Sequence, residues 1–339
     1  MIRVNNIHLS LDYDDKSVRK AVAQQLRIEE KSIKSCKIFR RSVDARKKDS
    51  IYFLTTVDAE LNINEDKVCK KCGNAQIARK YEYNQMKFGN APSPIVVGAG
   101  PAGLFAALIL ARSGANPILI ERGRDVDRRT ADVNRFWTSG QLDTTSNVQF
   151  GEGGAGTFSD GKLNSGTKDI RQRKVLEEFV SHGAPDEILY NAKPHIGTDM
   201  LKGTIKNIRN EIIELGGKVM FETKLVSMAF SDNKLKAITV ETANGDEIIE
   251  TDNIILAIGH SARDTFEMLY DLKLPIEAKP FSVGARIEHL RQKVDKAQYG
   301  RFAGNKKLGS ANYKLSTHLD NGRGVYTFCM CPGGKVVNA

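Results

Sequence analysis

The chain has 339 residues, of which 40% are hydrophobic and 27% charged. These proportions exclude a fibrous repeat and wholesale disorder and are typical of folded globular proteins. The length predicts two domains, at about 150 residues for each. The apolar run at 104–111 is too short to span a bilayer, and residues 1–15 lack the basic start and apolar core of a secretory signal. We therefore expect a cytoplasmic protein without a membrane span.

The formal net charge of +10 is unevenly distributed, since residues 1–90 hold 19 Lys and Arg against 12 Asp and Glu. A basic domain can attract an anionic partner such as a nucleic acid. A solvated charged face explains the same composition better, because no aromatic stacking pattern or nucleic-acid motif accompanies the charge. Contact with RNA through residues 1–88 is therefore kept as an alternative.

Residues 1–88 are predicted to form a small basic α+β domain. Residues 2–11 alternate apolar and polar side chains as a strand does, and Asp14, Asp15 and Ser17 are suited to begin a helix. The rest of this domain is expected to contain a strand at 34–44, a basic turn at 45–49, a strand at 50–61, and polar chain, helical or irregular, at 65–88. The loop at 89–94 is rich in Gly and Pro and predicts a domain boundary.

Five cysteines occur without a secretory signal, so structural disulfides are not expected. Cys69 and Cys72 have the spacing of half a zinc knuckle, and Cys329 and Cys331 form a second pair far downstream. A four-thiolate site would need the two ends of the chain to meet, and the CxxC has no thioredoxin-like context. We expect free thiols and no metal site.

Residues 93–339 are predicted to form a second domain of the α/β class. A short apolar strand from residue 95, a glycine-rich turn, a helix and an apolar strand at 117–120 make a β-α-β unit, which requires a parallel sheet. Later elements are expected to be a helix near 200–215 and strands at 218–221, 237–242 and 252–257. The inserted substrate region is expected around 160–220 and 265–330.

Residues 95–123 read IVVGAGPAGLFAALILARSGANPILIERG, with a GxGxxG turn between a strand and a helix. Gly98 suits a tight turn, Gly100 lets the backbone approach a pyrophosphate, and Gly103 lets the helix pack closely on the strand. The helix N-terminus offers free N–H groups to phosphates. Glu121 follows at the end of the next strand, where a carboxylate can accept hydrogen bonds from both ribose hydroxyls. The pattern predicts a dinucleotide site that fits NAD and FAD alike.

A resemblance to known flavoproteins favours FAD. The turn GAGPAG followed by Glu121-Arg122-Gly123 is similar to the flavoprotein variant of the motif, and residues 252–259 (DNIILAIG) resemble the strand and glycine turn that return to FAD in the glutathione-reductase-like superfamily. Nearly the whole chain resembles a bacterial FAD-dependent dehydrogenase family. The runs that carry this likeness are 42–48, 147–163, 193–199, 281–289 and 328–334.

The resemblance implies a Rossmann-like FAD-binding domain but no known substrate. Family members run on further, and the late glycine-aspartate segment that holds the ribityl chain in related flavoproteins is not found in this sequence. We therefore expect a truncated chain whose adenine half of the FAD site is complete and whose flavin half lacks a wall.

The glycine-rich loop at 151–161 is expected to lay backbone N–H groups against the cofactor; the alternative is a flexible lid. Lys162 could stabilise negative charge on the reduced flavin, or be an exposed lysine. The residues expected to contact FAD are Gly98, Gly100, Pro101, Ala102, Gly103, Glu121, Arg122, Gly154, Gly156, Thr157, Ser159, Asp160, Lys162, Val226, Ala257 and Gly259.

His195 and Arg286 are the candidates for catalysis, because a histidine can relay a proton near pH 7 and an arginine can clamp a carboxylate or phosphate. The alternatives are a packing histidine and a structural ion pair. With one dinucleotide fingerprint, either NAD(P)H visits the flavin transiently as electron donor or the substrate itself reduces the flavin.

The function expected first is an FAD-dependent oxidoreductase, a dehydrogenase of unknown substrate, in which the cofactor supplies the electron chemistry. A flavin-containing binding or redox-sensing module is the alternative. An NAD-dependent enzyme without flavin is disfavoured by Glu121-Arg122-Gly123.

Overall fold

The computed structural model describes residues 1–79, 81–89, 92–159, 161–163, 165–167, 169–328, 330–332, 334 and 336–338. Asp160 and Cys329 lie outside these residues. The helices are α1 (Asp15–Leu26), α2 (Glu65–Lys71), α3 (Pro101–Arg112), α4 (Val126–Ser139), α5 (Gln172–Ser181), α6 (Thr198–Glu214), α7 (Arg263–Asp271) and α8 (Arg291–Tyr299). Among the described residues, none of these helices is long and apolar enough to cross a membrane.

The described residues also form four sheets. Their strands are β1 (Ile2–Leu9), β2 (Ile33–Asp44), β3 (Tyr52–Leu61), β4 (Ala75–Ile77), β5 (Ile95–Val97), β6 (Ile118–Ile120), β7 (Lys218–Met220), β8 (Lys224–Ser231), β9 (Lys234–Thr242), β10 (Gly245–Glu250), β11 (Ile254–Leu256), β12 (Ser316–His318) and β13 (Gly324–Tyr326).

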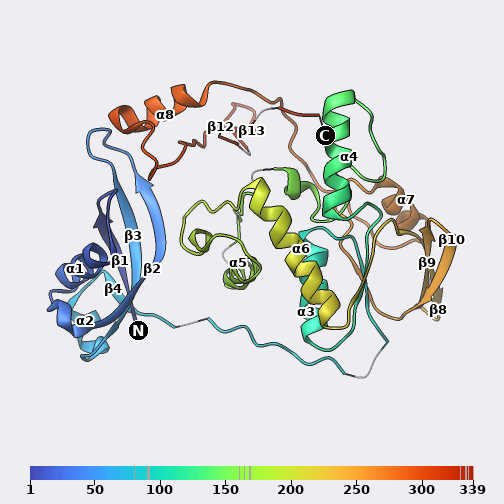
Figure 1. The fold of residues 1–339 in the computed structure, drawn as a ribbon, viewed down its shortest axis with the longest axis horizontal. Helices are drawn as coiled ribbons and strands as arrows, with labels where there is room; N and C mark the ends of the chain where they lie inside the picture. Colours follow the sequence, from blue (N-terminus) through green and yellow to red (C-terminus); the bar gives the residue numbers. More distant parts are fainter. Residues whose placement is uncertain are drawn as a thin grey trace.

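The N-terminal part of the chain is one antiparallel sheet with α1 and α2 on the same side (Figure 1). The strand order is β2-β3-β1-β4, and each pair of neighbours is antiparallel. This order in a β-α-β-β-α-β chain is the ferredoxin-like arrangement. β4 lies in the polar stretch for which the sequence predicted only helical or irregular chain.

Helix α1 begins where the sequence predicted. Asp14 is its N-cap, and the Asp14 carboxylate accepts a hydrogen bond from the Ser17 backbone N–H at 2.8 Å, which satisfies one of the free amides of the first turn. The helix buries Val18, Val22 and Leu26 at four-residue spacing, so one apolar stripe faces the sheet.

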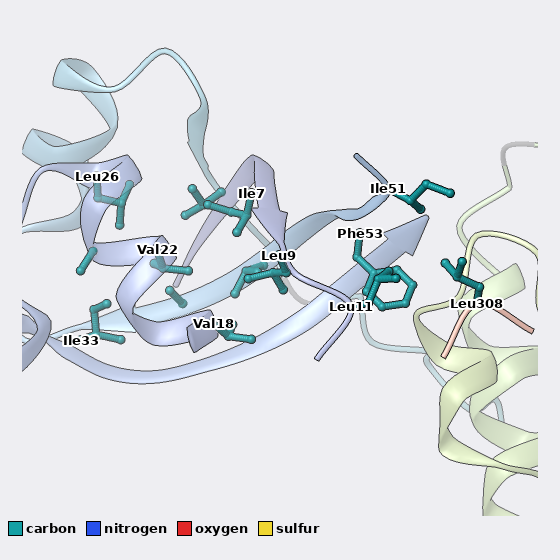
Figure 2. Packing of buried hydrophobic residues seen from close by; sticks show 14 of the residues in the cluster. Ile7, Leu9, Leu11, Val18, Val22, Leu26, Ile33, Ile51, Phe53 and Leu308 are labelled. Carbon is teal, nitrogen blue, oxygen red and sulfur yellow. The ribbon is translucent and has the colours of Figure 1, made fainter. Parts of the chain in front are cut away.

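The core of this N-terminal sheet also contains residues from the far end of the chain. Val294 and Tyr299 of α8, together with Leu308 and Ala311, are buried in the same cluster as β1, β3 and α1. Figure 2 shows Leu308 facing Leu11, Ile51 and Phe53. Residues 291–311 therefore pack with the N-terminal domain, although they are separated from it in sequence by the entire parallel sheet.

A second contact joins β2 to the segment before α6. The Arg41 backbone N–H donates to the Tyr190 carbonyl at 2.6 Å, and the Ala192 N–H donates to the Arg41 carbonyl at 2.8 Å. The Arg41 side chain donates to the Asn191 amide oxygen at 3.0 Å and to the Tyr13 hydroxyl at 2.8 Å. The N-terminal domain is thus tied to the rest of the chain at two separate places.

The predicted parallel sheet is confirmed, with the order β11-β5-β6-β7 and parallel neighbours throughout. Val96 and Leu119 face a core shared with α3 and α6, whereas Ile95, Val97 and Ile120 face the antiparallel sheet β8-β9-β10. This alternation follows from the period of two in a strand. The domain is therefore α/β with three layers (Figure 1). β7 belongs to this sheet, although it lies within the expected insertion at 160–220.

The cysteine pair of the N-terminal domain lies against its core. Cys69 and Cys72 are half-buried free thiols, and the Cys72 thiol donates to the Gln25 carbonyl at 3.4 Å. Within the described part of the chain no group of three or more His, Cys, Asp or Glu side chains could hold a metal ion. Burial raises the pKa of Cys69.

We predict that Leu308→Ala weakens the N-terminal domain although residue 308 lies outside it in sequence. Replacing a buried leucine with alanine typically lowers the free energy of unfolding by about 2 to 5 kcal/mol. Hydrogen exchange of β3 amides, read by mass spectrometry, should therefore show faster opening. Leu315→Ala removes an exposed side chain and should change that free energy by less than about 0.5 kcal/mol. Equal protection of β3 in Leu308→Ala and the unmodified chain would contradict the shared core.

Candidate dinucleotide site

A cavity of about 510 Å³ opens at the carboxyl ends of β5, β6 and β11, within the range of about 300 to 1,000 Å³ for small-molecule sites. The chain runs from β5 to β6 on one side, and β11 lies on the other side of β5. Strand order therefore reverses at β5, and ligands of open α/β sheets bind outside the carboxyl ends at such a point.

Nine residues expected to contact FAD line this cavity. They are Gly98, Gly100, Pro101, Ala102, Glu121, Arg122, Gly154, Ala257 and Gly259. The sequence reasoning missed a second group of lining residues, which includes Gln149, Phe150, Thr223, Leu225, Ser261, Thr265, Phe266 and Leu269. Most of this second group lies on β8, on α7 or just before the glycine-rich loop at 151–161. Each of these segments is far from the fingerprint in sequence.

Two of the three fingerprint glycines, Gly98 and Gly103, occupy positions that admit no side chain. Gly98 has φ +99°, and a Cβ there would lie 2.5 Å from the Ala257 carbonyl oxygen. A Cβ on Gly103 would lie 1.8 Å from the Gly98 carbonyl oxygen. These contacts agree with the tight turn and the close packing of helix on strand that the motif predicts.

Helix α3 begins at this turn without a side-chain cap. Gly100 is the N-cap, Pro101 follows at the first helical position, and no side chain among the described residues accepts a hydrogen bond from the first amides. Proline lacks an N–H, so the free donors are those of the next residues, beginning with Ala102. An uncapped helix N-terminus beside a cavity suits an anion such as a phosphate.

A second glycine-rich loop crosses this N-terminus. Gly154 has φ +65°, and a Cβ there would lie 3.1 Å from the Gly100 Cα and 3.2 Å from the Pro101 Cδ. The Gly153 N–H donates to the Ala99 carbonyl at 2.8 Å. The two loops therefore meet backbone to backbone, and the cavity lies beside the crossing.

Glu121 holds three chain segments together. One carboxylate oxygen, Oε2, accepts the Ala99 N–H at 2.7 Å, and the other, Oε1, accepts the Gly123 N–H at 2.9 Å and the Gly151 N–H at 3.0 Å. The sequence predicted ribose hydroxyls as the partners of this carboxylate. Because Oε2 accepts one hydrogen bond here, it keeps capacity for another at the cavity wall.

Arg129 supports the second glycine-rich loop from beneath. Its buried guanidinium donates to the carbonyls of Asn147, Val148 and Glu152 at 2.9, 3.1 and 2.6 Å. Burial lowers the pKa of Arg129 to about 10. The sequence reasoning missed this residue, but its spacing with Val126 and Val133 on the buried face of α4 is a signal that an amphipathic-helix analysis could have used.

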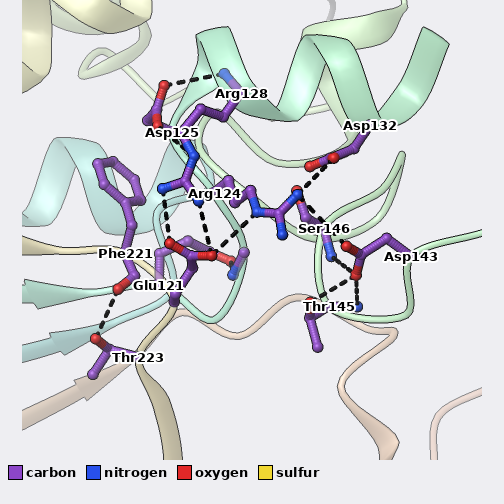
Figure 3. A network of polar contacts seen from close by, with 12 residues as sticks. Glu121, Arg124, Asp125, Arg128, Asp132, Asp143, Thr145, Ser146, Phe221 and Thr223 are labelled. Carbon is purple, nitrogen blue, oxygen red and sulfur yellow. Dashed lines mark hydrogen bonds and ion pairs between the residues drawn. The ribbon is translucent and has the colours of Figure 1, made fainter. Parts of the chain in front are cut away.

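The chain just after Glu121 is fixed by a network of charges (Figure 3). Arg124 donates to Asp132 at 2.7 Å and to Glu222 at 3.1 Å, and Arg128 donates to Glu222 at 2.7 Å. Hydrogen bonds from Arg128 lower the pKa of Glu222 although its partial burial opposes them. The end of β6 is thereby tied to α4 and to the turn between β7 and β8.

Arg122 closes one side of the cavity against α7. It donates to the Asp264 carboxylate at 2.9 Å and to the Thr265 hydroxyl at 2.9 Å, and its guanidinium lies 4.5 Å from the centre of the Phe150 ring. Burial raises the pKa of Asp264, but hydrogen bonds from Arg122 and Lys224 outweigh it, so the net pKa lies below its ordinary value.

The other residues expected to contact FAD do not line this cavity. These are Gly103, Gly156, Thr157, Ser159, Lys162 and Val226. Thr157 is buried beneath the loop, and Val226 is the strand neighbour of the lining residue Leu225. Their contact with the cofactor stays a prediction, and Asp160 lies outside the described residues.

The two candidates for catalysis lie apart from the cavity and from each other in the chain. His195 is exposed and pairs with Lys162 in an isolated antiparallel bridge. Arg286 is exposed in the segment between α7 and α8, which is assigned to neither helix nor strand. Neither lines the cavity, so their catalytic roles stay predictions.

Comparison with known families identifies the cofactor. A model described as FAD binding domain matches residues 93–133, and one described as FAD-dependent protein, C-terminal domain-like, matches residues 280–339. A domain of unknown function matches residues 1–60. The chain therefore binds FAD, and the uncapped helix N-terminus and the glycine crossing beside the cavity fit a dinucleotide.

A curated relative is longer than this chain. An uncharacterized protein of Clostridium beijerinckii is 46% identical over 344 residues, which cover 100% of this chain and 64% of the relative. The chain therefore spans about two thirds of the relative's length.

Solved structures resemble the chain only distantly. The crystal structure of Thermovibrio ammonificans THI4 has a TM-score of 0.37 and 14% identity, and covers 54% of this chain and 64% of that one. A 3-ketosteroid-delta4-(5alpha)-dehydrogenase from Rhodococcus jostii has a TM-score of 0.31 and 13% identity, with coverages of 49% and 48%.

The Arg122–Asp264 pair predicts a pH-dependent stability. Since the folded-state pKa of Asp264 lies below its unfolded value of about 3.9, the pair stabilises the fold above about pH 4, and this contribution falls as pH drops toward the folded-state pKa. Asp264→Asn should lower the melting temperature at pH 7, and the difference should shrink below about pH 4. A difference that is the same at pH 7 and pH 3 would contradict the assignment.

Proposed function

We propose that this FAD-binding chain is part of an FAD-dependent oxidoreductase and that the cavity at β5, β6 and β11 holds the adenosine diphosphate half of the cofactor. The observation that carries the proposal is the uncapped N-terminus of α3, which faces a cavity between two glycine-rich loops. When bound, FAD supplies two-electron or hydride transfer, and the protein supplies binding, orientation and electrostatics.

The residues of the cavity offer binding groups for three parts of the cofactor: the diphosphate, a ribose and a flat aromatic ring. The free amide of Ala102 at the start of α3 suits the diphosphate, and Glu121 Oε2 suits a ribose hydroxyl. Apolar side chains of Val97, Leu225 and Leu269 form a wall against which a flat aromatic group can pack. This set matches the polar and apolar parts of an adenosine diphosphate.

The proposed reaction is a dehydrogenation. The sequence contains one GxGxxG fingerprint in a strand-turn-helix context, so a nicotinamide reductant would visit transiently and would not occupy a domain of its own. A monooxygenase uses the same cofactor, and the choice of a dehydrogenase rests on the family resemblance in sequence.

Contact of residues 1–88 with an anionic partner stays a separate proposal. Part of the basic charge of this domain is already paired, since Arg3 donates to Asp58 at 2.7 Å and Arg46 donates to Asp44 at 2.5 Å. Paired arginines have fewer donors left for phosphates, so the oxidoreductase is the better supported proposal.

Gly100→Ala is predicted to weaken FAD binding while preserving the fold. A Cβ at this position would meet only the Gly154 Cα, at 3.9 Å, but it would stand where the backbone approaches the diphosphate. We expect at least a tenfold increase in Kd, which is about 1.4 kcal/mol, in a titration of FAD fluorescence.

Gly203→Ala is the matched control, since its Cβ would meet nothing within 4 Å and the residue lies on α6 outside the cavity lining. Its Kd should equal that of the unmodified chain. Equal FAD affinity in Gly100→Ala and Gly203→Ala would contradict the proposed placement of the diphosphate.

The proposal of a transient nicotinamide donor predicts that the bound flavin accepts electrons from NADH or NADPH. The FAD-loaded chain, mixed anaerobically with NADH or NADPH, should lose the visible absorbance of oxidised flavin faster than free FAD at the same concentration. Bleaching no faster than that of free FAD with either nicotinamide would count against a nicotinamide donor.

A further inference from the structure

The segment between α7 and α8 has the sequence of a β-strand. Residues 281–288 read FSVGARIE, in which Phe281, Val283, Ala285 and Ile287 alternate with polar or small residues. Strict alternation of this kind predicts a strand with one apolar face. The alternation places Phe281, Val283 and Ile287 on the same side.

In the structure this segment pairs with no strand among the described residues. Residues 281–288 form no backbone–backbone hydrogen bond with any other described residue, although the Glu288 carboxylate accepts a hydrogen bond from the Val336 N–H. Phe281, Val283 and Ile287 are 85%, 86% and 80% exposed. A row of large apolar side chains therefore faces solvent on a segment that is paired with no described strand, an arrangement that folded proteins avoid.

Neighbouring segments extend the exposed apolar surface. The Ser282 hydroxyl forms a hydrogen bond with the Tyr326 hydroxyl of β13, so the segment lies beside the β12–β13 hairpin. Tyr326 and Phe328 are themselves exposed. A two-stranded hairpin is marginally stable by itself. We call residues 281–288 the open strand.

We propose that the open strand is a docking edge for a β-strand from the part of longer proteins, such as the Clostridium beijerinckii relative, that lies outside the region aligned with this chain. The region of the relative that aligns with this chain is 46% identical to it and makes up 64% of the relative's length. The remaining 36% of the relative could supply the partner strand. A strand added to the open strand would satisfy its backbone groups and bury its apolar face.

Space at the edge is consistent with an added strand. A Cβ on Gly284, in the middle of the open strand, would meet nothing within 4 Å. A second copy of this chain could pair with the same edge, so the experiment must separate these two occupants. The inference concerns the covering of a strand and its test needs no flavin, so its failure and that of the proposed function are distinguishable.

Hydrogen exchange of this chain and of the full-length relative tests the proposal. Amides of residues 281–288 should exchange rapidly in this chain at every protein concentration, and the aligned amides of the relative should exchange at least about tenfold more slowly. Peptides from β9, which is paired on both sides here, provide the control and should be protected in both proteins.

Substitutions in the open strand provide a second test of whether another strand covers it. Val283→Asp and Ile287→Asp change exposed side chains and should leave the melting temperature of this chain unchanged, whereas the same changes at the aligned positions of the relative should remove the protection. Rapid exchange of the aligned segment in the unmodified relative would overturn the proposal. So would protection in this chain that rises with protein concentration and disappears in Val283→Asp, because the occupant would then be a second copy.

Discussion

The site depends on the buried carboxylate of Glu121. Its two oxygens accept backbone N–H groups from the fingerprint turn at Ala99, from the end of β6 at Gly123 and from the second glycine-rich loop at Gly151. Hydrogen bonds to a charged acceptor are roughly twice as strong as neutral ones. One side chain thereby holds together the three segments that border the cavity, and it keeps an acceptor position for a ligand.

The loops can meet at this carboxylate because the surrounding positions are glycines and because an arginine fills the space beneath. A Cβ on Gly154 would lie 3.1 Å from the Gly100 Cα, so a larger residue at position 154 would require a shift. Arg129 satisfies carbonyls that the loop would otherwise bury without partners. Buried carbonyls without partners are costly. The positive charge of Arg129 is also near Glu121 and Glu152, which partly offsets its burial. The dinucleotide site is therefore a preformed arrangement of backbone groups, held by two buried charged side chains.

The sequence predicted what is local and missed what is brought together over long distances. The β-α-β unit, the roles of Gly98 and Gly103 and the start of α1 at Asp14 follow from short-range patterns, and the structure agrees with each. The wall formed by α7, the loop support by Arg129 and the packing of Leu308 with the N-terminal core join residues more than fifteen positions apart. No periodicity in the sequence records such pairings. His195 and Arg286 are candidates by residue type alone, and neither lines the cavity.

The central claim is that FAD lies across the N-terminus of α3 with its ribose beside Glu121. The most direct measurement is a crystal structure of the chain grown with FAD. The account predicts the diphosphate within hydrogen-bonding distance of the Ala102 amide and a ribose hydroxyl on Glu121 Oε2. Ordered FAD bound elsewhere on the chain, with the cavity at β5, β6 and β11 lacking the cofactor, would contradict it.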